Sequence, residues 1–594
     1  MKKFIRMIVC LVVLFSVFNT ISAKANSKDQ KLVGVILPFS SAFVNIANEQ
    51  KNAIELAVKE FDDIKVIYED SKSDEAGAIE AFNKFTNMEN SPFAIISCAS
   101  WVATALHPLS AKENIFHIVI GSAIIERTQP KHTVRFTLDA NQEEKQLANY
   151  LIKFNRIAIY NMDNGYGNNW KKTIEQNLSD KIVKAIAYNP QNKDFKDDLA
   201  EIKKANPDVL VLLSAGNAAI IAKQARELGI TAKFVGTRPI ERSELLQEAQ
   251  YTDGLVYTYP SYDRYHPMIA KYTKEYGNPP TVFAVEAYDS MKSLLTAAKE
   301  GNHSTEALFD WYAGRTYIGA LGEVHFDENG DANYPYMYKE ISDGKFKTAN
   351  FQYSLLLENA RQEINKIFQH IDQDVKKTSE KLSVYGLTGK EVNKALQNLF
   401  ERNEYVYDCT TIDAKGIIKN VYPKKYEKII GADISKQPQI ARLHKTNEPV
   451  VSEAIDTVEG FLGFDLEHPI FDENGEFIGS LSVLTEPNFF DRIISQKVAN
   501  FPVEMWIMQK DGTVIYDVNE EEIGQNLFTD EIYAPYKSLI KLAIEMSITP
   551  HGSGGYSFLD KKLDKTVEKK IIWTTIAMHG TEVRLALAHV KDDF

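Results

Sequence analysis

Cysteine is scarce in this chain of 594 residues, which contains only Cys10, Cys98 and Cys409. Cys98 and Cys409 lie far apart, so they do not form the dense cysteine framework that stabilises small secreted domains. The paired cysteine spacing of zinc sites is also missing. We therefore expect free, buried thiols at these two positions, and we predict no metal or cofactor site.

Positive charge is also in short supply, because 68 Lys and Arg stand against 81 Asp and Glu, giving a formal net charge of −13. Such a chain has no general electrostatic attraction for phosphate backbones or anionic lipids, so we expect no nucleic-acid partner. The hydrophobic share of 44% and the charged share of 25% are typical of globular proteins. The length predicts several domains.

Long hydrophobic runs are missing outside the N-terminus. Three basic residues within the first six precede the apolar run Ile8–Phe18, and Ala23-Lys24-Ala25 supplies the small-x-small pattern of a signal-peptidase site. We predict a signal peptide over residues 1–25, with an uncleaved anchor as the alternative. The apolar run is shorter than the ~20 residues that a spanning helix needs. The mature chain is expected to be periplasmic or secreted, with no membrane span.

Sequence motifs of hydrolases are absent. There is no Gly-x-Ser-x-Gly elbow and no His-Glu-x-x-His helix, and no two of the 12 histidines lie four residues apart. We predict that the chain is not an enzyme and has no catalytic residues. An extracellular hydrolase is the weakest of the alternatives considered.

Short apolar runs alternate with segments of helical periodicity from Lys31 to about Tyr259. Continuous apolar strands separated by helices are typical of parallel sheets covered on both faces. The pattern occurs twice, which predicts two α/β lobes. The expected strands are Leu32–Leu37, Ile64–Tyr68, Phe93–Ser97 and Phe116–Ile120, and then Ile157–Tyr160, Ile182–Ala187, Val209–Leu213, Phe234–Gly236 and Leu255–Tyr259.

The pattern changes after Phe351. Apolar residues at spacings of three and four predict an amphipathic helix from about Tyr353 to Lys381. Strand patterns joined by Asp-x-x-Gly and Asp-Gly turns dominate beyond Glu404. We predict an α+β half with a long connecting helix at 351–403 and two sheet units at 404–497 and 500–594. The helical stripe consists of Ala360, Ile364, Ile367, Ile371 and Val375.

Ordered motifs in the first half resemble a known family. They include Gly34-Val35-Ile36-Leu37-Pro38-Phe39-Ser40, Ser97-Cys98-Ala99-Ser100 and Asp163-Asn164-Gly165-Tyr166-Gly167. Residues 27–350 resemble the type I periplasmic solute-binding proteins, the leucine-binding-protein-like family that serves ABC importers of branched-chain amino acids. This resemblance implies a two-lobed α/β fold that closes on a small solute.

The second half resembles a double Cache sensor, in which two PAS-like sheets follow a long N-terminal helix. The likeness rests on the hairpins at Asp413–Ile418 and Phe471–Leu484 and on Ile507–Asp517. The amino-acid signature of such sensors, with Arg, Trp and Tyr in close succession, is not present. Tyr422, Tyr426 and Asp465 are the candidates for a second ligand site in this half.

The principal ligand site is expected where strands end and helices begin. Ser100 and nearby backbone N–H groups at a helix start are suited to a ligand carboxylate, and the loop with Ser122 and Ala123 adds donors. The resemblance implies these two loops as the carboxylate grip and Tyr166 as a cover over the ligand. Phe43 and Trp101 are candidate apolar walls.

One position departs from the family pattern. Where the family commonly places an acid that pairs with the ligand ammonium, this chain has Arg238. A guanidinium repels an ammonium and pairs with a carboxylate, unless Arg238 only faces solvent. Glu241, Glu286 and Asp289 are the alternative acids. The sequence therefore predicts a carboxylate ligand with an apolar or aromatic body, which is either an amino acid or an amine-free carboxylate.

Two binding functions remain. The first is the solute-capturing component of an ABC importer, whose partner is a membrane permease. The second is a soluble receptor that is read by a membrane-bound signalling protein, with the Cache-like half as a second sensor. The Cache-like half favours the second function, because a protein that serves transport alone has no evident need of 240 additional residues.

Overall fold

The computed structural model describes residues 31–40, 43–61, 64–122, 130–137, 140–214, 216–264, 266–457, 462–485, 488–560 and 565–591. The predicted signal peptide, residues 1–25, lies outside them. The chain forms two compact units that meet between Gly344 and Lys345, and each is described separately. No described helix combines the length and apolar character needed to cross a membrane.

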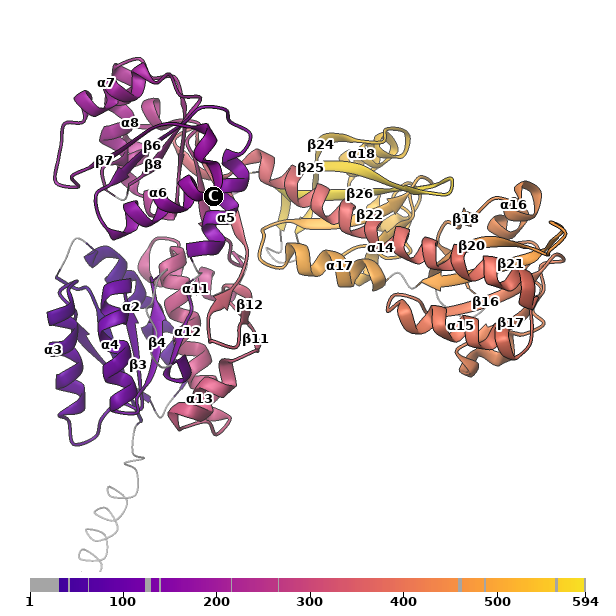
Figure 1. The fold of residues 1–594 in the computed structure, drawn as a ribbon, viewed down its shortest axis with the longest axis horizontal. Coiled ribbons are helices and arrows are strands. Elements are labelled where there is room, and N and C mark those ends of the chain that lie inside the picture. The colour runs from indigo at the N-terminus through magenta and orange to yellow at the C-terminus, as the bar shows by residue number, and fades with distance from the viewer. Residues whose placement is uncertain are drawn as a thin grey trace, which may run out of the picture. The chain divides into compact units, whose positions relative to one another are not determined.

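The first lobe of the N-terminal unit is built on a parallel sheet with the order β2-β1-β3-β4-β5 (Figure 1). Helices cover both faces, so β3 and β4 are buried along their whole length. The strands are β1 (Lys31–Leu37), β2 (Ile64–Asp70), β3 (Ala94–Cys98), β4 (Phe116–Ile120) and β5 (Thr133–Arg135), and the connecting helices are α2 (Val44–Val58), α3 (Glu75–Thr86) and α4 (Ser100–Lys112).

The second lobe contains the other series of strands, in the order β14-β10-β9-β8-β6-β7. The pairs are parallel except for β10 with β14. The strands are β6 (Ile157–Met162), β7 (Ile182–Tyr188), β8 (Val209–Leu213), β9 (Lys233–Gly236), β10 (Val256–Pro260) and β14 (Tyr336–Ser342), and the main helices are α5 (Ala140–Leu151), α6 (Gly165–Leu178), α7 (Lys196–Lys204) and α8 (Ala218–Glu227). The expected two-lobed α/β fold is confirmed.

The chain passes between the lobes three times: between β5 and α5, between β10 and α11, and between β13 and β14. After β10 it returns to the first lobe, where α11 and α12 pack against α2, and α13 packs against β4 (Figure 1). Strand periodicity gave no indication of this return. The returning elements are α11 (Pro267–Tyr276), α12 (Val282–Lys299), α13 (Thr305–Tyr312) and a small sheet of β11 (Thr316–Gly319), β12 (Gly322–Phe326) and β13 (Ala332–Asn333).

The C-terminal unit begins with a short strand, β15 (Lys345–Thr348), which is followed by a long helix, α14 (Asn350–Tyr385). The expected single helix over 351–403 is wrong in one respect, because a break separates α14 from α15 (Lys390–Arg402). Gly386 and Gly389, at the two sides of the break, have φ values of 75° and 112°. These values lie in a region that side chains with a Cβ rarely adopt, so the helix ends there.

Two antiparallel sheets follow, as the second half of the sequence predicted. The first has the order β17-β16-β21-β20-β18, with β19 also paired to β20, and the second has the order β23-β22-β26-β25-β24. The first comprises β16 (Asp408–Asp413), β17 (Ile418–Tyr422), β18 (Val450–Val451), β19 (Ile455–Asp456), β20 (Leu462–Phe471) and β21 (Phe477–Thr485). The second comprises β22 (Glu504–Gln509), β23 (Val514–Tyr516), β24 (Gly552–Asp560), β25 (Lys565–Met578) and β26 (Thr581–Val590). The main helices beside these sheets are α16 (Pro438–Thr446), α17 (Asn488–Val498) and α18 (Lys537–Ile548).

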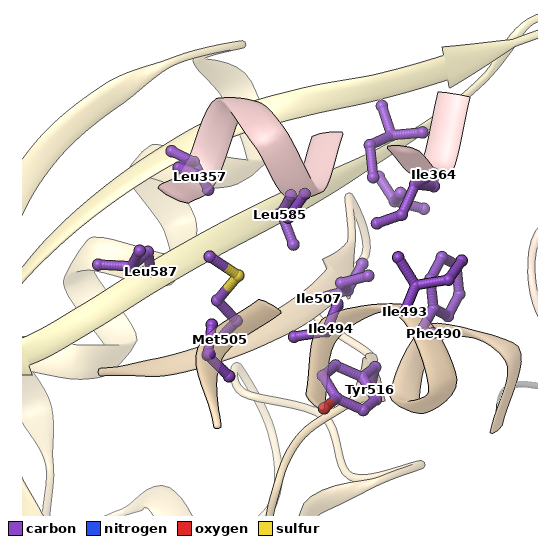
Figure 2. Packing of buried hydrophobic residues seen from close by; sticks show 14 of the residues in the cluster. Leu357, Ile364, Phe490, Ile493, Ile494, Met505, Ile507, Tyr516, Leu585 and Leu587 are labelled. Atoms are coloured by element: carbon purple, nitrogen blue, oxygen red, sulfur yellow. The ribbon is translucent and has the colours of Figure 1, made fainter. Parts of the chain in front are cut away.

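The apolar stripe of α14 contributes to the cores of both sheets. Its N-terminal part, from Tyr353 to Phe368, packs with α17 against the second sheet. Figure 2 shows Leu357 and Ile364 beside Leu585, Met505 and other members of this cluster. The C-terminal part of the stripe, from Ile371 to Leu382, packs with α15 against the first sheet. The predicted stripe is therefore present, and a single helix supports both sheets.

The stability of the C-terminal unit is expected to depend on pH through His589. Its ring stacks on Tyr353, with ring centroids 3.8 Å apart, and burial lowers the pKa of His589 to about 4. In the unfolded chain a histidine pKa is about 6.5. As the pH falls from about 6.5 towards 4, the unfolded chain binds a proton that the folded chain does not. The free energy of unfolding therefore decreases, by up to about 2–3 kcal/mol.

Replacing His589 by Phe keeps a stacking ring and removes the titration. We expect urea denaturation at pH 7 and pH 4.5, followed by circular dichroism, to show a smaller loss of stability in His589→Phe than in the unmodified chain. His370→Phe is the matched control, because its side chain on α14 is 64% exposed. An unchanged loss of stability in His589→Phe would contradict the prediction.

Candidate ligand-binding site

The first loop of the site joins β3 to α4. Ala99, at this junction, has φ 88° and ψ 143°, a conformation that is strained for a residue with a Cβ. The next residue, Ser100, opens α4, and its Oγ accepts a hydrogen bond from Ser122 Oγ at 3.1 Å. The two loops that the sequence predicted for a carboxylate are therefore in contact through their hydroxyl groups.

The second loop follows β4 and packs tightly on the first. Gly121 has φ 59°, and a Cβ at this position would lie 2.6 Å from Cys98 Sγ. Only glycine allows the second loop to lie this close to Cys98. Cys98 is a free buried thiol, and burial raises its pKa to about 12.

Glu286, in α12, is fully buried behind these loops. Its Oε2 accepts hydrogen bonds from Gly121 N at 3.1 Å and from Thr137 Oγ1 at 2.7 Å, and its Oε1 accepts one from Tyr334 OH at 3.0 Å. Thr137 and Tyr334 belong to two different segments that cross between the lobes. Glu286 therefore joins the second loop to two of the three crossing segments.

Arg238 follows β9 in the second lobe and is only 7% exposed. Its Nε lies 3.8 Å from Glu143 Oε2, and Glu143 also accepts hydrogen bonds from Thr258 Oγ1 at 2.7 Å and from Tyr336 OH at 3.4 Å. Arg238 Nη1 is buried and has no hydrogen-bond partner among the described residues. A buried donor without a partner carries a desolvation cost of about 1–3 kcal/mol, or more for a charged group.

The charges around Arg238 keep it cationic. Burial by itself lowers the pKa of Arg238, but Tyr336, Glu143 and Glu286 outweigh it and raise the pKa above the ordinary value. Burial raises the pKa of Glu143, and the nearby guanidinium opposes that rise. The predicted solvent-facing alternative for Arg238 is therefore wrong, because the guanidinium is enclosed by acids and tyrosines.

Tyr166 lies in the first turn of α6, at the same end of the second lobe. The side chain of Asn164 caps this helix by accepting a hydrogen bond from Gly167 N at 2.9 Å. Tyr166 OH forms a short hydrogen bond with Thr237 Oγ1, and Thr237 immediately precedes Arg238. The ring of Tyr166 is thus held beside the arginine by a neighbouring residue.

The remaining predicted residues of this site lie at its margin or outside the described residues. The rings of Phe43 and Trp101 are 6.3 Å apart, and Trp101 is 40% exposed. Trp101 Nε1 donates to Ser73 O at 3.0 Å. Ala123 lies outside the described residues.

Two of the three alternative acids are engaged elsewhere. Glu241 accepts from Tyr257 OH and Lys339 Nζ, each at 2.5 Å. Asp289 accepts from the backbone N–H groups of Ala320 and Leu321 at 2.9 and 2.6 Å, and burial raises the pKa of Asp289 to about 7. Both acids are therefore held by groups of the local structure. The acids that remain near Arg238 are Glu286 and Glu143, and the sequence did not predict Glu143.

The candidates for a second site in the C-terminal unit are not brought together. Asp465 borders a cavity of about 30 Å³, which is the size of a single water molecule. Tyr422 and Tyr426 do not line it. Their rings pack against Phe400 and Tyr407, with centroid distances of 5.4 and 5.0 Å.

A larger cavity, of about 200 Å³, lies in the second sheet unit. Its polar lining includes Glu504, Asp517 and Lys569, and burial together with the charge of Glu522 raises the pKa of Asp517 to about 8. Sequence reasoning missed this cavity, because its lining comes from strands and loops scattered between residues 504 and 569.

Sequence reasoning also missed four groups around Arg238 and Glu286. Thr137, Tyr334 and Tyr336 belong to or flank crossing segments, and Glu143 opens α5 without any distinctive motif. Only the Tyr-Pro-Tyr sequence at 334–336, with two tyrosines about a proline in a short connection, is a signal that could have been noticed.

The sequence profile described as periplasmic binding protein matches residues 32–345, which is more than half of the chain. A second profile, the sensor domain of HK/GC/chemotaxis-like proteins, matches residues 366–487. The chain therefore belongs to the periplasmic binding protein family and carries a sensor domain in its C-terminal half. The periplasmic binding family is a family of ligand binders and not of enzymes.

Three solved structures are similar to this chain. An extracellular ligand binding receptor from Desulfohalobium retbaense is 48% identical, with 94% of this chain and 100% of that chain covered and a TM-score of 0.61. A leucine binding protein, LivK, from Thermotoga maritima is 20% identical over 54% of this chain and 97% of that chain, with a TM-score of 0.49. A solute binding protein from Rhodopseudomonas palustris, in complex with 3,4-dihydroxy benzoic acid, is 22% identical over 54% and 96%, with a TM-score of 0.49. No curated protein matched the chain.

Proposed function

We propose that this chain is an extracytoplasmic receptor that captures a carboxylate-bearing solute between the two lobes of its N-terminal unit. The observation that carries the proposal is the buried guanidinium of Arg238, whose Nη1 has no partner among the described residues. An enclosed cation with an unused donor is suited to an anionic ligand, and a carboxylate accepts two parallel hydrogen bonds from a guanidinium.

The other lobe offers complementary donors. The hydroxyls of Ser100 and Ser122 face each other at the start of α4, where the positive end of the helix favours negative charge. Tyr166 supplies an aromatic ring in the second lobe, and Phe43 and Trp101 supply apolar surface in the first. A solute with a carboxylate and an apolar or aromatic body satisfies both sets of groups.

Capture works through the crossing segments. A solute that contacts both lobes stabilises the closed arrangement and shifts the equilibrium between open and closed forms. Glu286 holds two of these segments through Thr137 and Tyr334, so it positions the hinge, and its hydrogen bonds use most of its acceptor sites. This arrangement favours amine-free carboxylates at least as much as amino acids.

For its output we propose the solute-delivering component of an ABC importer that meets a membrane permease. The second candidate is a receptor read by a membrane-bound signalling protein, and the match of residues 366–487 to a sensor domain supports it. Amide hydrogen exchange, measured with and without the solute, distinguishes these two functions. Slower exchange in residues 366–487 when the solute is added favours signalling, and unchanged exchange favours the importer.

The ligand class is tested with three molecules that share a branched body. Leucine has a carboxylate and an amine, α-ketoisocaproate lacks the amine, and isoamylamine lacks the carboxylate; benzoate adds an aromatic body. At about 100 times its Kd, a ligand stabilises the domain that binds it by roughly 2.7 kcal/mol. We expect thermal unfolding of the full chain to shift with carboxylates and not with isoamylamine. A shift with isoamylamine, or with none of the carboxylates, would contradict the proposal.

A further inference from the structure

Three side chains that are far apart in the sequence meet inside the C-terminal unit. Asp372 lies in α14, His468 in β20, and His579 in the turn between β25 and β26 (Figure 1 labels these elements). Asp372 Oδ1 is 2.7 Å from Nε2 of His468 and 2.7 Å from Nε2 of His579. One ligand atom from each residue lies within 4.8 Å of the other two.

The position of His579 is set by backbone contacts that do not involve its ring. Met578 ends β25 and Thr581 begins β26, so His579 and Gly580 form a two-residue turn with φ values of 45° and 84°. Asn-Gly is the preferred pair in turns where both residues have positive φ, so a histidine here is not explained by the turn. Arg442 Nη2 holds the carbonyl oxygen of His579 at 3.1 Å.

The same arginine connects the turn to the first sheet. Arg442 Nη2 also donates to Val451 O at 2.8 Å, and Thr581 Oγ1 donates to the same oxygen. The turn of the second sheet is therefore attached to β18 of the first sheet, and the imidazole of His579 is directed to Asp372 from a fixed backbone.

The other two residues are anchored in regular structure. His468 pairs with Leu481 in the middle of the first sheet, and its side chain is only 6% exposed. Asp372 is 22% exposed and lies on the helix that supports both sheets. Burial raises the pKa of Asp372, but the hydrogen bonds from His468 and His579 outweigh it and hold the pKa below the ordinary value.

Two imidazole nitrogens and one carboxylate oxygen are a ligand set that divalent transition metals prefer. Without an ion, both imidazoles donate a proton to the same carboxylate oxygen. With an ion, the same three atoms bind the metal and a fourth position is left for water. The three atoms already lie within 4.8 Å of one another, so they are close enough to share one ion.

We propose that Asp372, His468 and His579 bind one divalent transition-metal ion such as Zn²⁺, and that this ion joins α14 to both sheets of the C-terminal unit. The sequence contains no sign of such a site, because the three ligands are separated by 96 and 111 residues along the chain. This proposal is independent of the ligand-binding function proposed for the N-terminal unit.

The test uses the full chain without a histidine tag, treated with EDTA and dialysed before titration with ZnCl₂ and CoCl₂. We expect calorimetry to give one equivalent of Zn²⁺, the bound Co²⁺ to give the intense visible absorption of a four-coordinate complex, and Zn²⁺ to raise the temperature of unfolding. His579→Asn preserves the turn preference and removes one ligand. We expect it to weaken Zn²⁺ binding at least about tenfold.

Asp372→Asn and His468→Gln remove the other two ligands and are expected to weaken binding in the same way. His551→Asn is the matched control, because His551 is exposed and lies outside the cluster; its Zn²⁺ affinity should be unchanged. If His468→Gln fails to fold because His468 is buried, the variant His579→Asn, in a turn and only partly buried, still decides the question. No Zn²⁺ binding by the unmodified chain, or equal affinity in His579→Asn, would overturn the proposal.

Discussion

We expect Arg238→Gln to weaken the binding of a stabilising carboxylate by about 100-fold to 1,000-fold. Removing one member of a buried charge pair costs about 2–5 kcal/mol, and each 1.4 kcal/mol is a factor of ten in affinity. The glutamine retains hydrogen-bonding capacity, so the loss reports the charge and the second donor of the guanidinium. The measurement is a calorimetric titration of the full chain with whichever carboxylate gives the largest thermal shift.

Stability must be separated from binding in this experiment, because Arg238→Gln leaves Glu143 buried without its cation. Burial already raises the pKa of Glu143, so the uncompensated acid is expected to take up a proton, and the variant loses stability as the pH rises. The double variant Glu143→Gln/Arg238→Gln removes the unpaired acid. It should therefore regain stability without regaining affinity for the carboxylate.

Arg242→Gln is the matched control for Arg238. Arg242 lies four residues further along the chain, is one-third exposed, and pairs only loosely with Glu244 at 3.7 Å. A surface pair of this kind contributes about 0–1 kcal/mol, so carboxylate affinity should stay within a factor of about two. If Arg238→Gln binds the carboxylate as tightly as Arg242→Gln, Arg238 does not contact the ligand.

Replacing Gly167 by Ala is expected to destabilise the second lobe by about 3 kcal/mol and to disturb the position of Tyr166. A Cβ at residue 167 would lie 2.0 Å from Met162 O and 2.9 Å from Met162 N and C. These are backbone atoms of β6, which cannot move aside as a flexible side chain does. Overpacking of this kind typically costs 1–3 kcal/mol, sometimes more.

Gly165 supplies the control within the same turn. A Cβ at residue 165 has no atom within 4 Å, and alanine is favoured over glycine in a helix by about 0.5–1 kcal/mol. Gly165→Ala should therefore be neutral or stabilising. Hydrogen exchange of peptides that cover α6 is the measurement, with faster exchange expected only in Gly167→Ala. Equal exchange in both variants would contradict the prediction, because it would show that β6 and α6 can move apart without destabilising the second lobe.

These two glycines illustrate how much of the fold follows from local sequence. The strands β1 to β4 and β6 to β10 were predicted because parallel strands and their covering helices have short-range periodicity, whereas β5 and β14 were not predicted. The return of α11, α12 and α13 to the first lobe was not predicted. It is decided by packing against α2 and β4, residues more than 150 positions earlier.

Some of the candidate residues could be placed from the sequence for the same reason, and their role in binding stays a prediction. Ser100, Ser122, Tyr166 and Arg238 lie at strand ends, where a sequence pattern is informative. Glu143 and Tyr334 were missed, because their roles depend on contacts with Arg238 and Glu286, which lie far from them in the sequence. The break between α14 and α15 is marked by two glycines three residues apart, but the helical periodicity on both sides predicted one continuous helix.

The two buried thiols make this chain convenient for optical measurement of lobe closure. Cys98 and Cys409 are both fully packed, and burial raises the pKa of each thiol above its ordinary range, so maleimide dyes should not label them in the folded chain. If the expressed chain starts after residue 25, cysteines introduced at the exposed positions Lys112 and Lys172, one in each lobe, would be the reactive pair. Energy transfer between dyes at these positions would then report solute capture in real time, without removal of a native cysteine.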